Sequence, residues 1–258
     1  MKLPSEDTQT VRAVDRALQI MALFDDEHNS VTLRDVLAKT QLPKTTAIRL
    51  MQTLEHNGML HSGRNGEYVG GLSLLRWARL AERTWTIPAE AGAILESLAE
   101  TCGETVNVYV RRGIFRVCVA QHEGPQTLRH VVRVGDQLPL WAGGAAKILL
   151  LEAPDELLEA VAAASPDGLA HLPQLKQWID EARRDGFATS RAEREVGLAS
   201  IAVPVRSRSG AVLASLSLGG PSDRFTDDKA PAMVRVLTRG ADAFEEAGYF
   251  EHLPAYRP

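Results

Sequence analysis

The sequence predicts an α+β protein with a small helical N-terminal part and a larger C-terminal part built on an antiparallel sheet. Between residues 11 and 56, apolar residues recur at helical spacing in three short segments. Beyond residue 104, β-branched runs follow one another across tight turns, as in hairpins. With 258 residues and 45% hydrophobic composition, the chain is long enough for two cores of this kind.

The composition excludes several classes of protein. A formal net charge of −4 argues against a general polyanion coat, so any nucleic-acid contact has to come from a local patch. There is no run of ~18 apolar residues and no apolar segment near the N-terminus, so we expect a cytoplasmic protein without a membrane partner. Cys102 and Cys118 alone predict reduced core cysteines, and no metal or cofactor is expected.

The first expected helix covers residues 11–24. Its apolar residues form one stripe that we expect to pack under the helices that follow. The stripe consists of Val11, Val14, Ala17, Leu18, Met21 and Phe24.

A pair of short helices comes next. The Thr32 hydroxyl and the Asp35 carboxylate predict a cap for a helix that continues to about residue 40. Pro43 suits the first position of a second helix, which Asn57-Gly58 ends. Its inward face is expected to hold Ala47, Leu50, Met51 and Leu54. Two short helices joined by a tight turn form a helix-turn-helix.

The outward face of the second helix has the chemistry of a DNA reader. In this motif the second helix enters the major groove, where Thr, Arg and Gln pair with bases or phosphates and Lys holds a phosphate. Two β-prone runs around residues 63–66 add a hairpin, the wing. The candidate contacts are Lys44, Thr45, Thr46, Arg49 and Gln52 of the helix and Arg64 of the wing. The alternative is a helix pair and hairpin that serve only as scaffold.

A connector helix is expected within residues 72–87. Its apolar positions at helical spacing are Leu74, Trp77, Ala78, Ala81 and Trp85. Two tryptophans on a connector need a partner surface, which is either a second subunit or the same chain.

The elements of the second part alternate between helices and strands. Helices are expected over 88–103, 153–164, 172–186 and 227–248, and strands over 105–110, 115–120, 128–134, 187–190, 199–206 and 212–218. A helix rich in small residues opens after residue 138, with Gly143-Gly144-Ala145-Ala146 at its start. These residues suit either a small anion on the backbone N–H groups or close helix-to-sheet packing.

Long segments of the chain resemble IclR-type bacterial transcriptional regulators. The N-terminal resemblance rests on AVDRALQIMALF (13–24), LRDVLAKTQLPKTTAIRLMQTLEHNGML (33–60) and GEYVGGLSLL (66–75). The C-terminal resemblance rests on VGDQLPL (134–140), AGGAAK (142–147), REVGLASIAVPV (194–205) and SLSLGGP (215–221).

The resemblance implies a winged helix-turn-helix domain over 8–71, a connector over 72–87 and a GAF-like effector domain over 88–250. It further implies a homodimer or dimer of dimers on a palindromic promoter operator in double-stranded DNA, and a small organic effector such as a carboxylate or aromatic metabolite. By position, the effector-binding residues are Leu140, Gly144, Ala145, Ser190, Ser200, Ser215 and Ser217. Three positions depart from the family pattern, since Trp141 replaces a common His, Ser190 an acid and Ser200 a Cys.

Two other functions compete with a ligand-responsive regulator. An enzyme is disfavoured because no nucleophile with a base partner is identifiable, and Glu193 and Glu195 alternate with arginines as in a solvated or ion-paired loop. The other competitor is a ligand-independent DNA-binding protein with a degenerate sensor domain.

Overall fold

The computed structural model describes residues 10–25, 28–85 and 87–251. The chain forms two compact units that divide between residues 84 and 85. The division falls within the predicted connector 72–87. Within the described ranges, no helix is long and apolar enough to cross a membrane.

The first unit has the predicted helix-turn-helix and hairpin. Its helices are α1 (Arg12–Met21), α2 (Leu33–Thr40) and α3 (Lys44–His56), and its strands are β1 (Ser30–Thr32), β2 (Leu60–Ser62) and β3 (Glu67–Gly70). The strands form an antiparallel sheet in the order β1-β3-β2. The sequence predicted two strands here, and the additional one is β1. It pairs with β3 and buries Val31 in the core of the unit.

The two helix starts differ in their geometry. At α2 the predicted capping box forms, with the Asp35 N–H donating to Thr32 Oγ1 at 3.3 Å and the Thr32 N–H donating to Asp35 Oδ2 at 2.9 Å. At α3 the prediction for Pro43 was wrong by one residue, because Pro43 has an extended ψ of 139°. Pro43 is therefore the N-cap, and its carbonyl accepts the N–H of Ala47 at 3.0 Å.

The predicted packing of α1 was partly wrong. Val11, Val14 and Leu18 are exposed, with Val11 and Leu18 at 65% and 60%, whereas Ile20 is fully buried. The buried side of α1 lies at its C-terminal end, where Ile20 joins a core that includes Val36 of α2 and Met51 of α3. Met21 and Phe24 of the predicted stripe also pack against this core, so the misjudged residues are Val11, Val14 and Leu18.

Helix α4 (Ser73–Trp85) contains no buried residue. Leu75 and Trp77 are 70% and 53% exposed, and Ala78 and Ala81 are also exposed. Trp85, its last residue, packs partly against the core of the second unit.

The second unit is built on a six-stranded sheet, antiparallel throughout, in the order β6-β5-β4-β9-β8-β7. The strands are β4 (Thr105–Arg112), β5 (Phe115–His122), β6 (Gln137–Pro139), β7 (Ala188–Arg191), β8 (Leu198–Arg206) and β9 (Val212–Pro221). The helices are α5 (Ala89–Cys102), α6 (Gly144–Leu149), α7 (Asp155–Ala163), α8 (Leu172–Asp185) and α9 (Ala230–Ala247), with short 3-10 turns at Gly168–His171 and Ser222–Arg224.

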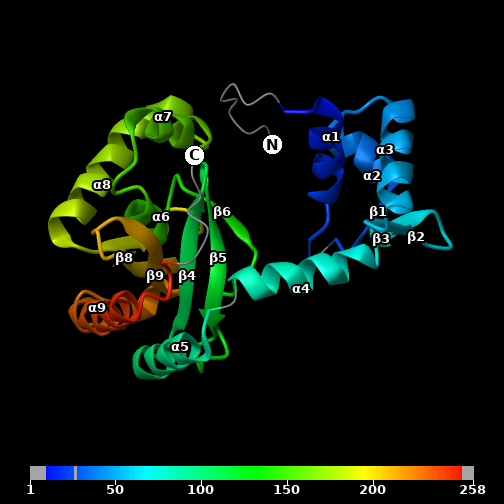
Figure 1. Ribbon diagram of the computed structural model, residues 1–258. Coiled ribbons are helices and arrows are strands. Elements are labelled where there is room, and N and C mark those ends of the chain that lie inside the picture. The colour runs from blue at the N-terminus through cyan, green and yellow to red at the C-terminus, as the bar shows by residue number, and fades with distance from the viewer. Residues whose placement is uncertain (1–9, 26–27, 86, 252–258) are drawn as a thin grey trace. The chain divides into compact units, whose positions relative to one another are not determined.

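Each face of this sheet carries its own core. Helices α5 and α9 lie together at one side (Figure 1), and Leu95, Leu216 and Phe244 belong to the core there. Helices α6, α7 and α8 cover the other core, which includes Cys118, Ile148 and Leu175. Both cysteines are free thiols, as predicted, and burial raises the pKa of Cys118 to about 12.

The strand expected over 128–134 does not form. Leu128, Val131 and Val134 are exposed and only Val132 is buried, so the β-branched residues do not reflect a half-buried strand. The segment instead ends in a turn, in which the Asp136 N–H donates to the Arg133 carbonyl and Asp136 Oδ2 accepts the Arg133 N–H at 2.7 Å. The strand at this edge is β6, which pairs with β5.

Candidate functional site

The outward face of α3 is formed by the predicted polar residues. Ala47 and Met51 hold the opposite face in the core, so the helix cannot turn without exposing them. The side chains of the candidate set are exposed except for Thr46, which is half-buried; the exposed ones are Lys44, Thr45, Arg49, Gln52 and, in the wing, Arg64.

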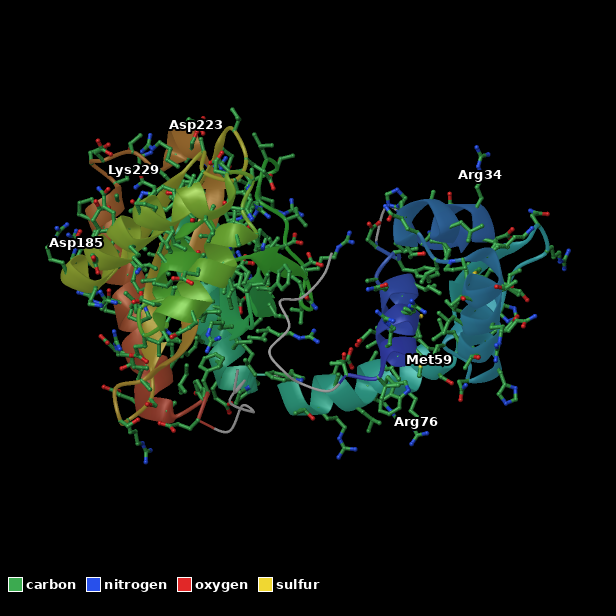
Figure 2. The ribbon with its side chains drawn as sticks, turned by 90° about the horizontal axis from the view of Figure 1, so that it is seen from above. Arg34, Met59, Arg76, Asp185, Asp223 and Lys229 are labelled. Carbon is green, nitrogen blue, oxygen red and sulfur yellow. The ribbon has the colours of Figure 1, made fainter. Side chains whose placement is uncertain are left out.

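The cations of this surface lack acidic partners. Within the described residues, Lys44, Arg49 and Arg64 form no ion pair. Arg34 of α2 also points away from the unit (Figure 2). Unpaired surface cations are available to phosphate oxygens without first breaking another contact.

Two acids of the same region, Asp35 and Glu55, are committed to structural hydrogen bonds. Asp35 forms the cap of α2, and its bonds to Thr32 hold the pKa of its carboxyl below the usual value. Glu55 Oε1 accepts the Ser62 hydroxyl and the Ser62 N–H, the latter at 3.1 Å, and these bonds lower the pKa of Glu55. Glu55 thereby ties the end of α3 to the first strand of the wing.

A polar cavity opens in the second unit beside the start of α6. Five of the seven residues proposed for an effector line it: Gly144, Ala145, Ser190, Ser200 and Ser217. Leu140 and Ser215 do not line it; both are fully buried, and the Ser215 hydroxyl has no hydrogen-bond partner among the described residues.

Several residues of the cavity were not predicted from the sequence. These are Asn107, Tyr109, Arg116, His130 and Arg194. A signal for two of them was present, since Asn107 and Arg116 interrupt otherwise apolar strands. A polar residue on the buried face of a strand needs a partner, and partners gather around cavities and sites.

The start of α6 is already occupied by groups of the protein itself. The Gly143 N–H donates to Glu193 Oε2 at 3.0 Å, and the Gly144 N–H donates to Ser200 Oγ at 3.1 Å. A Cβ on Gly144 would lie 3.1 Å from the Ala188 carbonyl oxygen, so the small residue also permits close packing. The packing role of the small residues is therefore present, while the N–H groups of Gly143 and Gly144 already bond to side chains of the protein.

Glu193 forms a buried ion pair with Lys147. Lys147 Nζ lies 2.6 Å from Glu193 Oε1 and donates to the Thr189 carbonyl at 2.7 Å, and the two side chains are 6% and 12% exposed. Burial lowers the pKa of Lys147, and Glu193 opposes that shift. The predicted ion-paired loop is confirmed, since Arg194 also pairs with Glu195 at 2.9 Å.

His130 lies at the cavity beside Arg194. Its Nε2 is 3.4 Å from Arg194 Nη2. Burial, and then the charge of Arg194, lower the pKa of His130. A neutral imidazole is therefore favoured there.

Trp141, one of the three departures from the family pattern named from the sequence, does not line the cavity. Its carbonyl oxygen lies 2.7 Å from His171 Nε2, and its ring meets the His171 ring edge-on at 6.5 Å between centroids. The bulk of Trp141 is taken up by packing against His171.

A winged helix-turn-helix with an exposed basic face, joined to an α+β unit with a polar cavity, defines a class of DNA-binding transcriptional regulators with a C-terminal effector-binding domain. Comparisons with known proteins agree. Residues 81–245 match the family described as bacterial transcriptional regulator IclR C-terminal, and residues 13–63 match the IclR helix-turn-helix domain. The chain belongs to the IclR family of transcriptional regulators.

Similar proteins include a named repressor and regulators of known structure. The chain is 28% identical to the HTH-type transcriptional repressor AllR of Escherichia coli K12 over 225 residues, or 84% of this chain and 83% of AllR. It is 39% identical to an IclR-family regulator from Rhodococcus sp. of known structure, with a TM-score of 0.64 and coverage of 98% and 100%. An IclR homologue from Microbacterium hydrocarbonoxydans, crystallised with 4-hydroxybenzoate, shares the fold at 22% identity and a TM-score of 0.73, with coverage of 91% and 98%.

Of the two competing functions, the family comparison bears on the enzyme. Proteins of this family are transcriptional regulators rather than enzymes, and the relatives include named repressors.

Proposed function

We propose that the chain binds a palindromic promoter operator as a homodimer or dimer of dimers, and that a small organic effector in the cavity changes this binding. The observation that carries the proposal is the outward face of α3 and the wing, where three cations have no ion-pair partner among the described residues. The predicted contacts are Lys44, Thr45, Thr46, Arg49 and Gln52 in the major groove and Arg64 on the backbone or in the minor groove.

Exposed apolar residues of the first unit support a dimer. On or next to α1 they are Val11, Val14 and Leu18, and on or next to α4 they are Leu72, Leu75, Trp77 and Leu80. Exposed apolar side chains in this number are costly in water unless another surface covers them. We infer that a second copy does so, because a twofold pair presents two α3 helices to the two halves of a palindrome.

The effector proposal rests on the polar cavity of the second unit. Gly144, Ala145, Ser190, Ser200 and Ser217 line it and would contact the effector, while Leu140 and Ser215 would support it from the core. The Microbacterium homologue crystallised with 4-hydroxybenzoate favours an aromatic carboxylate as the first compound to test. The working domain limits are 8–71, 72–87 and 88–250.

The proposed response is a population shift. An effector that binds one arrangement of the connector more tightly than another changes the spacing of the two recognition helices. On a palindrome these must sit about 34 Å apart in successive major grooves.

Footprinting of the DNA upstream of the gene tests the operator proposal. Two protected half-sites about one helical turn apart are expected. Sedimentation of wild-type protein and of Leu75→Glu tests the dimer: the charge should convert dimers to monomers, whereas Leu169→Glu, at an exposed leucine of the second unit, should not. A single protected half-site, or a monomeric wild type, would contradict the respective proposal.

A further inference from the structure

Arg116 differs from the other cations at and beside the cavity of the second unit because it forms no ion pair within the described residues. Lys147 pairs with Glu193, and Arg194 pairs with Glu195. Arg116, on β5, also lines the cavity and forms no ion pair within the ranges described. One cation of the cavity therefore has no ion-pair partner among the described residues.

Arg116 is held in place but incompletely satisfied. The residue is 5% exposed, and its Nη1 donates to the carbonyl oxygens of Pro139 and Ala142. The Tyr109 ring centroid lies 5.5 Å from its Cζ. Its Nε is buried and has no hydrogen-bond partner among the described residues. A buried donor without an acceptor is costly, and a buried unpaired charge more so.

The backbone beside Arg116 is shaped to admit the guanidinium. Gly143 has a φ of 103°, which favours glycine, and a Cβ at that position would lie 3.0 Å from Arg116 Nη2. Burial lowers the pKa of Arg116 to about 10, so the group stays charged at neutral pH. The start of α6 offers no equal site, because Glu193 and Ser200 already accept the N–H groups of Gly143 and Gly144.

We propose that Arg116 is the anion-binding and specificity-determining residue of the cavity, and that the ligand of this protein is a monoanion whose single carboxylate pairs with Arg116. The inference rests on the proposed effector role of the same cavity. A carboxylate in the cavity that pairs with the guanidinium supplies the missing counter-charge. Guanidinium and carboxylate match as planar partners, and charge-assisted hydrogen bonds of this kind are about twice as strong as neutral ones. A neutral or cationic ligand leaves Arg116 unpaired and is rejected.

The test compares acids with their uncharged amides on the full-length protein. Calorimetry and melting temperature are recorded for 4-hydroxybenzoate against 4-hydroxybenzamide and for lactate against lactamide. Wild type should prefer the acid of at least one pair by roughly tenfold to hundredfold, because hydrogen bonds to charged groups contribute about 1.5–3 kcal/mol. Arg116→Met should abolish the preference by weakening the acid and leaving the amide unchanged.

Two further variants serve as a second test of Arg116 and as a control. Arg116→Gln keeps a polar side chain and should also lose the preference for the acid over the amide. This variant tests the role of Arg116 if Arg116→Met does not fold. Arg235→Met, on the exposed face of α9, is the matched control and should bind as wild type does. Ligand-free operator affinity of Arg235→Met should equal that of wild type.

The failures are distinguishable. If both neutral variants keep the acid preference, or if wild type binds acid and amide equally, the role of Arg116 is wrong and the effector proposal stands. If no probe binds wild type while operator DNA does, the effector proposal fails and this inference fails with it.

Discussion

Replacing Arg49 by alanine tests the DNA-binding surface through the salt dependence of the DNA-binding constant, which can be calculated from the number of exposed cations. Each copy presents the side chains of Lys44, Arg49 and Arg64 without an acidic partner among the described residues. If two copies bind and every cation meets a phosphate, the logarithm of the binding constant should fall with the logarithm of salt concentration at a slope of about −5. Arg49→Ala removes one cation per copy and should reduce the slope to about −4.

The affinity change distinguishes phosphate contact from base contact. If Arg49 pairs with a guanine, its loss costs about 1–3 kcal/mol on the operator and relaxes specificity at one position of each half-site. Fluorescence anisotropy over a salt series, on operator and scrambled duplexes, measures both effects. Arg235→Ala, far along the sequence on α9, is the control. An unchanged slope and affinity for Arg49→Ala, with intact folding, would refute the assignment of α3 as the recognition helix.

Three further perturbations follow from the described contacts. Thr32→Ala removes the cap of α2 and should lower the stability of that helix by about 0.5–2 kcal/mol, measured by hydrogen exchange of its amides; unchanged exchange would contradict the cap. Glu193→Gln leaves the Lys147 ammonium buried without its counter-charge and should lower the free energy of unfolding in urea by about 3–5 kcal/mol. The double variant Glu193→Gln/Lys147→Met should regain most of this loss. If Glu193→Gln leaves the free energy of unfolding unchanged, the ion pair is solvated. Burial and the charge of Arg194 lower the pKa of His130 in the folded state. Below about pH 6.5 the unfolded state therefore binds more protons than the folded state, and the free energy of unfolding falls as the pH falls. His130→Gln should flatten the fall in melting temperature between pH 7 and 5, and an identical pH profile would contradict this cause.

Local patterns predicted the first unit well because its determinants are local. The Thr32–Asp35 cap spans three residues, and the inward face of α3 follows one helical period. The exposed stripe of α1 was misjudged for a physical reason: an apolar face shows that something covers it, but not whether that is the same chain. Val11 and Leu18 lie on such a face, and our proposal assigns it to a second copy.

The second unit shows where sequence patterns fail. The run 128–134 has the composition of a strand, but the N–H and carbonyl groups of Arg133 bond to Asp136 in the turn at 133–136. The cavity depends on pairs distant in sequence, such as Lys147 with Glu193, which no periodicity connects. Arg116 could be noticed in the sequence only as a charged residue within an apolar strand. The residues that lie beside it in the sheet could not be identified from the sequence.

The central claim is that a small acid in the cavity controls operator binding, and one titration tests it most directly. Full-length protein is bound to its labelled upstream DNA, and anisotropy is followed as 4-hydroxybenzoate is added, with 4-hydroxybenzamide and a scrambled duplex as controls. The account predicts that the acid changes operator affinity severalfold in wild type, while the amide does not, and that Arg116→Met removes the response without altering ligand-free binding. An acid that binds the protein and leaves operator affinity unchanged would contradict the account.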